Sequence, residues 1–266
     1  MVKILAIGDP HGELDKIKQI SLKNINLILL TGDLGNANLM RKIAFENIKR
    51  KKQGLKKKEY SPKKRKRAFM EAYTSTIKII KYLTKIAPVY IIFGNVEISN
   101  SETKKMSKEI ELPLPFLTND LKNIKKVKII NNKIANHQGI KIGGLNYFID
   151  TNWIKDFKPS DFKEKLIKAK KETKKAQSIL KKFKNVNILV CHQPPYGILD
   201  KVTAKFAPKH WQKKHAGSKT ILKYIQNHQP QYVFCGHIHE GKGMKKIGKT
   251  KVYNLGIAGH KIVNIN

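Results

Sequence analysis

Short apolar runs that end in a polar side chain recur along this chain and constrain its fold more than any other feature. Val2–Gly8 leads directly into Asp9, and Leu27–Thr31 leads through a glycine into Asp33. Apolar runs of this length, bounded by turn residues, are typical of strands buried on both faces of a sheet. Between them, Glu13–Leu22 has apolar residues at helical spacing. The order strand, helix, strand predicts a βαβ unit, which places the two aspartates at neighbouring strand ends.

Three later apolar runs end in the same way. Pro88–Phe93 is followed by Asn95, Val186–Cys191 by His192, and Gln231–Cys235 by a His-x-His segment. In open α/β sheets, binding sites form outside the carboxyl ends of the strands, so these chain-distant segments are expected to meet. The resulting candidate metal ligands are Asp9, His11, Asp33, Asn95, His192, His237 and His239.

Carboxylate, amide and imidazole side chains suit divalent metal ions such as Mn, Fe, Zn, Co or Ni. Taken singly, a Gly-Asp pair after a strand is usually a turn, and a His-x-His segment is often no ligand. Here such residues follow five predicted strands of one sheet pattern. Their joint occurrence favours a metal site over a set of unrelated turns.

The rest of the chain extends the α/β pattern. Residues 38–86 interrupt it with two expected helices, Leu39–Gln53 and Pro62–Ile86, around a basic loop Lys51–Arg67. We expect this helical hairpin to be an insertion within a single domain spanning residues 1–266. Further strands are expected at Val127–Ile130, Lys133–Ala135 and Gly139–Leu145, further helices at Pro159–Lys184 and Ser218–His228, and antiparallel strands from Gly243 to Ile265.

The charge of the chain is strongly positive. Lys and Arg number 55 against 19 Asp and Glu, a formal net charge of +36. Such a field favours polyanionic partners, including nucleic acid through the Lys51–Arg67 loop. Against nucleic acid, the basic residues are spread over the whole chain and no aromatic platform for bases is visible. No run approaches the ~20 apolar residues that span a membrane. We therefore expect a cytoplasmic protein without a membrane partner.

The five segments that carry the candidate ligands read Gly8-Asp9-Pro10-His11-Gly12, Gly32-Asp33, Gly94-Asn95, Cys191-His192-Gln193-Pro194-Pro195 and Gly236-His237-Ile238-His239. Together they resemble the motifs of the calcineurin-like metallophosphoesterase family. The resemblance covers most of the chain outside residues 38–86. It implies an α/β four-layer sandwich, in which two mixed β-sheets are flanked by helices.

Carried over residue by residue, the resemblance implies a dinuclear metal site. One divalent ion would be held by Asp9, His11 and His239. The other would be held by Asn95, His192 and His237, and both would share the carboxylate of Asp33. A shared carboxylate suits cations roughly 3.5–4 Å apart. The implied activity is hydrolysis of phosphomono- or phosphodiesters by attack of a metal-bridging hydroxide, with Asp33 and Asn95 in the catalytic site.

One position departs from the family pattern. The residue after Gly94-Asn95 is usually a histidine that donates a proton to the leaving group, but here it is Val96. The segment Lys201–Ser218 lies between two ligand motifs, so it can supply a substitute. Its candidate proton donors are His215, His210 and Lys205, and Asn146 and Tyr147 are further candidates for lining the site.

Two alternatives to a small-molecule phosphoesterase stay open at this point. The positive charge is compatible with a nuclease or another nucleic-acid-associated phosphoesterase. Val96 is compatible with a non-catalytic interaction scaffold on the same fold, although all seven ligand positions are retained. The sequence does not indicate an oligomeric state.

Overall fold

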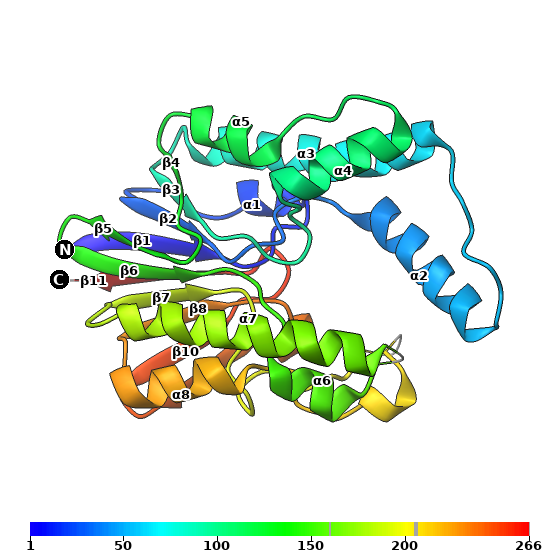
Figure 1. The fold of residues 1–266 in the computed structure, drawn as a ribbon. Helices are drawn as coiled ribbons and strands as arrows, with labels where there is room; N and C mark the ends of the chain where they lie inside the picture. Colours follow the sequence, from blue (N-terminus) through cyan, green and yellow to red (C-terminus); the bar gives the residue numbers. More distant parts are fainter. Residues whose placement is uncertain (160, 205–206, 266) are drawn as a thin grey trace.

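Two β-sheets packed face to face, with helices on both outer faces, form the architecture of the chain (Figure 1). The computed structural model describes every residue except 160, 205, 206 and 266, and leaves out the side chain of residue 52. The expected α/β sandwich of two mixed sheets flanked by helices is confirmed. Lys205, one of the candidate proton donors, lies outside the described residues.

Within the described residues, the first sheet has five strands in the order β11-β1-β2-β3-β4, and the second has six in the order β5-β6-β7-β8-β10-β9. The first sheet comprises β1 (Val2–Ile7), β2 (Leu27–Leu30), β3 (Val89–Ile91), β4 (Val127–Ile129) and β11 (His260–Ile265). The second comprises β5 (Lys133–His137), β6 (Ile140–Leu145), β7 (Ile188–Cys191), β8 (Tyr232–Cys235), β9 (Gly243–Ile247) and β10 (Thr250–Asn254). Strands β1 to β4 run parallel, as do β6, β7, β8 and β10, so each sheet gathers its carboxyl strand ends at one edge.

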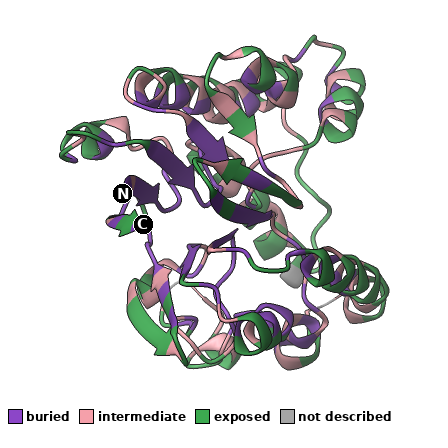
Figure 2. Ribbon diagram, turned by 90° about the vertical axis from the view of Figure 1, so that its left-hand side faces the viewer, coloured by how far each residue is buried: buried purple, intermediate pink, exposed green. Residues whose placement is uncertain are grey.

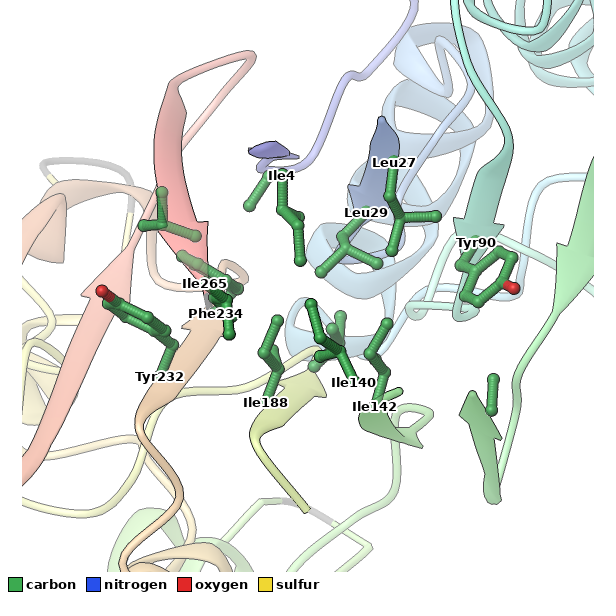
Figure 3. Close-up of a cluster of buried hydrophobic side chains, with 14 of the residues drawn as sticks. Ile4, Leu27, Leu29, Tyr90, Ile140, Ile142, Ile188, Tyr232, Phe234 and Ile265 are labelled. Atoms are coloured by element: carbon green, nitrogen blue, oxygen red, sulfur yellow. The ribbon is translucent and has the colours of Figure 1, made fainter. Parts of the chain in front are cut away.

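Alternating side chains of the central strands fill two different layers of the core. In β1, Ile4 and Ala6 belong to the layer between the sheets, whereas Leu5 and Ile7 pack beneath the helices. Successive residues of a strand face opposite sides, so a strand that is covered on both sides is apolar throughout. Figure 2 shows the buried residues concentrated in these strands, and Figure 3 shows the layer between the sheets, with Leu29, Ile142, Ile188 and Phe234.

Helices bury apolar stripes on the outer face of each sheet. The first sheet is covered by α1 (Leu14–Lys18), α3 (Pro62–Leu83) and α5 (Leu117–Asn123), and the second by α7 (Phe162–Lys182) and α8 (Lys219–His228). The remaining helices are α2 (Asn38–Lys52), α4 (Asn100–Ile110) and α6 (Thr151–Phe157), with short 3-10 turns at Lys209–Trp211 and His239–Gly241.

One expectation about these elements needs correction. The Lys51–Arg67 segment is not one loop, because Ser61 caps α3 and Pro62 begins it, so the basic residues from 63 to 67 are helical. Helix α3 also contributes to the core, because Ile79, Ile80 and Leu83 are fully buried against the first sheet. The last three strands each have an antiparallel partner, as expected: β9 pairs with β10, and β11 crosses to the first sheet and pairs with β1.

Helix α2 differs from the other long helices in standing away from the sheets. Figure 1 shows it projecting from the body and joined to α3 by an extended connection. None of its described residues is buried, and Ile48 is half exposed. Separately, no helix within the described part of the chain is both long and apolar enough to cross a bilayer.

Candidate metal centre

The seven candidate ligands follow the carboxyl ends of five strands, and the structure brings them together. Asp9 and His11 follow β1, Asp33 follows β2, and Asn95 follows β3. His192 follows β7, and both His237 and His239 follow β8. Each is within 4 Å of at least one other member of the set. The expectation that these segments converge is therefore met by the geometry.

The first group of donor atoms is formed by Asp9, His11 and His239. The Nε2 atoms of His11 and His239 are 3.2 Å apart, and His239 Nε2 is 3.1 Å from Asp9 Oδ2. Two imidazole nitrogens and a carboxylate oxygen that converge on one point are a donor set for a divalent transition metal. This trio could hold a metal ion.

The second group lies around His192, which is fully buried. Its Nδ1 donates to the Thr31 carbonyl oxygen at 2.8 Å, and its Nε2 is 3.0 Å from Asn95 Oδ1. Asn95 Oδ1 is also 2.9 Å from His237 Nδ1. A backbone carbonyl that holds one ring nitrogen of a histidine fixes the other as the ligand atom, as is usual in metal sites.

Asp33 lies between the two groups. Its Oδ2 is 3.7 Å from His11 Nε2, and its Oδ1 is 3.6 Å from His192 Nε2. One carboxylate oxygen therefore faces each group, as a bridging carboxylate requires. Asp9 also reaches both groups, since its Oδ1 is 3.7 Å from His192 Nδ1, and Asp9, Asp33 and His192 form a second trio that could hold an ion.

The backbone at these strand ends adopts an uncommon conformation. His11, Asp33 and His237 have φ values of 45°, 48° and 65°, in the left-handed region that residues other than glycine seldom occupy. Such conformations cost on the order of 1–3 kcal/mol each and cluster at functional sites. Here they occur at three candidate ligands, in the segments that follow β1, β2 and β8.

Two glycines allow the ligand segments to approach one another. A Cβ atom on Gly236 would overlap the carboxylate of Asp9, and one on Gly94 would overlap Asp33 Oδ1. Because the segments after β3 and β8 pass so close to these carboxylates, no larger residue fits at either glycine.

The protonation states of the group suit metal binding. Burial lowers the pKa of His237 to about 3 and that of His11 to about 4, so both rings are neutral at neutral pH. Burial alone would raise the pKa of Asp9, but the neighbouring His192 and a hydrogen bond with His239 lower it to about 2. Neutral imidazole and ionised carboxylate are the forms that bind metals.

Two supporting residues were not identified from the sequence. Thr31 Oγ1 donates to Asp9 Oδ1 at 2.8 Å. The Glu97 carboxylate accepts the backbone N–H groups of Asp33, Leu34 and Gly94 at 2.7–3.0 Å. Burial and the adjacent Asp33 raise the pKa of Glu97 to about 7. The only sequence signal for Glu97 was its place two residues after Asn95.

Arg41 is a third residue that sequence reasoning missed at this site. Helix α2 places its Nη2 atom 3.1 and 3.2 Å from the two ring nitrogens of His11 and 3.9 Å from Asp33 Oδ2. No motif marks Arg41, because its approach to the centre depends on how α2 is oriented. It brings a permanent positive charge and a planar set of donors to the edge of the centre.

Position 96 contributes through its backbone. The Val96 N–H donates to Asp33 Oδ1 at 2.9 Å, so the segment after β3 still holds Asp33. The valine side chain lines a small, mostly apolar cavity with Met40 and Phe69. Valine at this position therefore keeps the backbone contact without offering a proton.

Tyr147 brings a hydroxyl group to the same region. Its ring centroid is 5.3 Å from that of His237 and 5.7 Å from that of His192. Burial, with the nearby carboxylates of Glu172 and Asp33, raises the pKa of Tyr147 to about 12. The hydroxyl therefore keeps its proton at neutral pH.

The candidate donors His215 and His210 make no hydrogen bond, ion pair or ring contact with the seven ligands within the described residues. His215 Nδ1 is 2.6 Å from Asp200 Oδ1, and the buried Asp200 also accepts the backbone N–H groups of Gly197 and Gly217. The ring of His210 lies against Trp211. Asp200 thus orients His215, while a catalytic role for either histidine stays a prediction.

Comparison with known proteins identifies a family for the chain. The model of the calcineurin-like phosphoesterase family matches residues 2–241. That range contains all seven candidate ligands.

Individual relatives match shorter stretches. An uncharacterized protein of Methanocaldococcus jannaschii is 30% identical over 157 residues, which are 58% of this chain and 60% of that protein. Metallophosphoesterase domain-containing protein 1 of Homo sapiens is 35% identical over 88 residues, 31% of this chain and 25% of that protein. The matches therefore span less than two thirds of the length of these relatives.

A solved structure shows the same fold over nearly the whole chain. The phosphopantetheinyl hydrolase of Mycobacterium tuberculosis aligns with a TM-score of 0.54 at 10% identity, covering 96% of this chain and 89% of that one. At that identity, the similarity concerns the fold alone.

Proposed function

Because the chain belongs to the calcineurin-like phosphoesterase family, we propose that it is a metal-dependent phosphoesterase that hydrolyses phosphomono- or phosphodiesters at a dinuclear centre. The observation that carries the proposal is the position of Asp33, with one carboxylate oxygen toward His11 and the other toward His192. Two sets of nitrogen and oxygen donors flank this carboxylate. Their chemistry fits two divalent ions.

The seven candidate ligands would be divided between the two ions in the way that the family resemblance implies. Asp9, His11 and His239 would hold one ion. Asn95, His192 and His237 would hold the second, with Asp33 shared. When bound, such ions supply Lewis acidity toward the phosphoryl oxygens and lower the pKa of a coordinated water. Of the ions considered, Mn, Fe, Zn, Co and Ni all suit these donors.

The chain's own residues orient the centre and the substrate. The Thr31 carbonyl holds His192 by Nδ1 and so presents its Nε2, while Thr31 Oγ1 and the His237 N–H fix Asp9. The Arg41 guanidinium lies at the edge of the centre, where it can donate two hydrogen bonds to the oxygens of a phosphoryl group. Together these contacts would orient a phosphoryl group at the centre.

Leaving-group departure depends on a proton donor. Val96 offers none. The Tyr147 ring lies against His237, and its protonated hydroxyl makes no hydrogen bond within the described residues, so it is one candidate. His215, held by Asp200, is the candidate from the Lys201–Ser218 segment. Cleavage of esters with poor leaving groups is expected to be slow unless one of these groups contributes.

A substrate panel tests the proposal. The purified protein is stripped of metal, reloaded with Mn²⁺, and assayed with phosphomonoesters, phosphodiesters and cyclic nucleotides. We expect hydrolysis of at least one class only in the presence of metal. A protein that binds divalent ions but cleaves no ester in the panel would support the scaffold alternative instead.

A nucleic-acid-associated phosphoesterase is the second candidate, favoured by a basic groove. Between α2 and the start of α3 lies a groove of about 700 Å³, whose lining includes Lys42, Lys63, Lys64 and Arg67. None of these four forms an ion pair within the described residues, and the groove carboxylate of Glu71 accepts the Leu39 N–H. Basic side chains without ion-pair partners fit the phosphates of a single strand.

Salt dependence separates this candidate from the general charge of the chain. Serine at the four groove positions should flatten the slope of log affinity against log salt for single-stranded DNA by roughly 0.7 per lost phosphate contact. The control is serine at four exposed lysines of α7: Lys163, Lys170, Lys174 and Lys181. If the two variants have equal slopes, binding depends on net charge alone.

The cellular location is not tested by the structure, so the expected cytoplasmic location stays a prediction.

A further inference from the structure

A second cleft, of about 730 Å³, adjoins the metal centre, and most of the residues that line it have no part in the proposed hydrolysis. Its walls come from the segments after β3, β4 and β6 and from helices α4, α5 and α7. Helix α2, which carries Arg41, contributes none of the residues that line it. Ligand sites commonly have volumes of roughly 300–1,000 Å³, so the cleft is large enough for a substantial organic group.

Asn95 and Tyr147 connect the cleft to the centre. Both line it. Asn95 Oδ1 is 2.9 Å from His237 Nδ1, and the Tyr147 ring lies against His237 and His192. A phosphoryl group held at the centre would therefore have this cleft next to it. The group esterified to the phosphate is the part of the substrate that would enter it.

Amide side chains dominate the polar lining of the cleft. Five asparagines contribute to it: Asn95, Asn100, Asn131, Asn132 and Asn146. The Asn100 amide is used by the protein, since its Nδ2 donates to Asn119 Oδ1 at 3.0 Å. The Asn131 side chain uses only its Oδ1, which accepts the Phe93 N–H at 2.8 Å. Within the described residues, the Asn146 side chain and the Nδ2 groups of Asn131 and Asn132 make no hydrogen bond, so these amide groups are left for a ligand.

The charged residues of the cleft are largely engaged by the protein. Glu102 closes the capping box of α4 with Ser99. Glu172 accepts the Ile149 N–H at 2.7 Å, and Lys168 is 3.7 Å from its other oxygen. Because these carboxylates are already hydrogen-bonded to the protein while amide groups stay free, the cleft fits a neutral ligand that both donates and accepts hydrogen bonds.

We propose that this cleft binds the nucleoside part of a nucleotide substrate, with the base near the Tyr147 ring and its edge paired with asparagine amides. A side-chain amide presents a donor beside an acceptor, which matches the adjacent donor and acceptor on the edge of a nucleobase. Aromatic rings add stacking that suits any base. The inference rests on the proposed phosphoesterase function, because the centre must hold the phosphate.

Three measurements on the Mn²⁺-loaded protein test the cleft. They are the kcat/KM for a nucleoside 5′-monophosphate, the kcat/KM for ethyl phosphate, and binding of the unphosphorylated nucleoside by calorimetry. We expect the nucleotide to be the better substrate and the nucleoside to bind. Asn146→Leu should weaken nucleoside binding roughly three- to tenfold, the effect of one lost hydrogen bond.

Matched variants separate the cleft from a general loss of structure. Asn132 has a φ of 57°, so Asn132→Gly removes its amide without backbone strain and is the second test if Asn146→Leu does not fold. The control is Asn227→Leu, the same replacement at an exposed position of α8, where nucleoside binding should be unchanged.

The outcomes distinguish this inference from the proposed function. One outcome is that no phosphate ester is hydrolysed, but the nucleoside binds and Asn146→Leu weakens its binding. Nucleoside binding in the cleft is then supported and the proposed hydrolytic function is wrong. If esters are hydrolysed, yet the nucleoside does not bind or both cleft variants bind it as the parent does, the cleft inference is overturned. Preference for a hexose phosphate, with hexose binding in place of nucleoside, overturns it as well.

Discussion

The strand-end ligands and helix α2 meet at the same centre but are held in opposite ways. Asp9, Asp33 and His192 are at most 2% exposed and are fixed by hydrogen bonds to the backbone or to Thr31. No described residue of α2 is buried. Its far half bonds chiefly to the connection that follows it, as Asn47 and Glu46 do with Lys58.

This difference separates two roles. Buried, backbone-held side chains keep their geometry with or without a ligand, so they suit a metal centre. Arg41 is carried on a helix with few buried contacts, so its position depends on the charges around it. We expect changes to the strand-end ligands to weaken or abolish metal binding, and changes on α2 to alter substrate binding.

The largest expected effect concerns the leaving group, and it arises at the strand ends. Valine at position 96 removes a proton donor whose help is worth roughly 10²–10⁴-fold. Nitrophenyl esters should therefore turn over far faster than alkyl esters, and Val96→His should narrow the gap by accelerating alkyl esters most. Steady-state rates with both ester classes provide the measurement.

Equal rates for both classes, with chemistry rate-limiting, would show that a substitute acid is present. Alanine at the residue responsible should then slow alkyl esters and spare nitrophenyl esters. His215→Ala and His210→Ala test the Lys201–Ser218 segment. If neither has this effect, that segment is not the proton source.

The second effect tests how tightly the strand ends pack. In Gly236→Ala the new Cβ overlaps the Asp9 carboxylate, so Asp9 must shift and its contact with His239 is disturbed. Metal affinity should fall by roughly 10–100-fold, as is typical when the contacts that orient a metal-ligating side chain are lost. Calorimetric titration with Mn²⁺ measures it. The control is Gly139→Ala, in the turn between β5 and β6, where a new Cβ meets open space and metal affinity should stay unchanged.

The strand ends were predictable because a short apolar run bounded by glycine identifies both a buried strand and the polar residue that follows it. Arg41 was not, because its contact with His11 depends on the orientation of α2. Helix α4 is predictable from the sequence, because the capping box formed by Ser99 and Glu102 marks its start. The short α5 and α6, of seven residues each, lack a full helical period pattern and take their shape from packing.

The third and smaller effect tests α2. Arg41→Gln removes a positive charge beside His11 and Asp33, so Mn²⁺ should bind more tightly, by up to roughly tenfold for a partly exposed cation. Inorganic phosphate should inhibit less well, by roughly tenfold or more, because a charge-assisted hydrogen bond is lost. Opposite changes in the two constants are the signature of a phosphate-binding arginine.

Arg50→Gln is the matched control, since Arg50 lies on the same helix and its Nε donates to the Lys56 carbonyl instead of reaching the centre. Both constants should stay near those of the parent protein. If Arg41→Gln leaves phosphate inhibition unchanged in an active enzyme, Arg41 does not contact the substrate, and the division of roles between the strand ends and α2 fails.

The most direct test of the dinuclear centre is the number of ions bound per chain. Elemental analysis of the metal-loaded protein, combined with calorimetry, should give two for the parent. Asp33→Ala removes the carboxylate that faces both His11 and His192, so it should lose both ions, whereas His11→Ala should chiefly weaken one. An Asp33→Ala protein that still binds two ions with unchanged affinity would contradict the account.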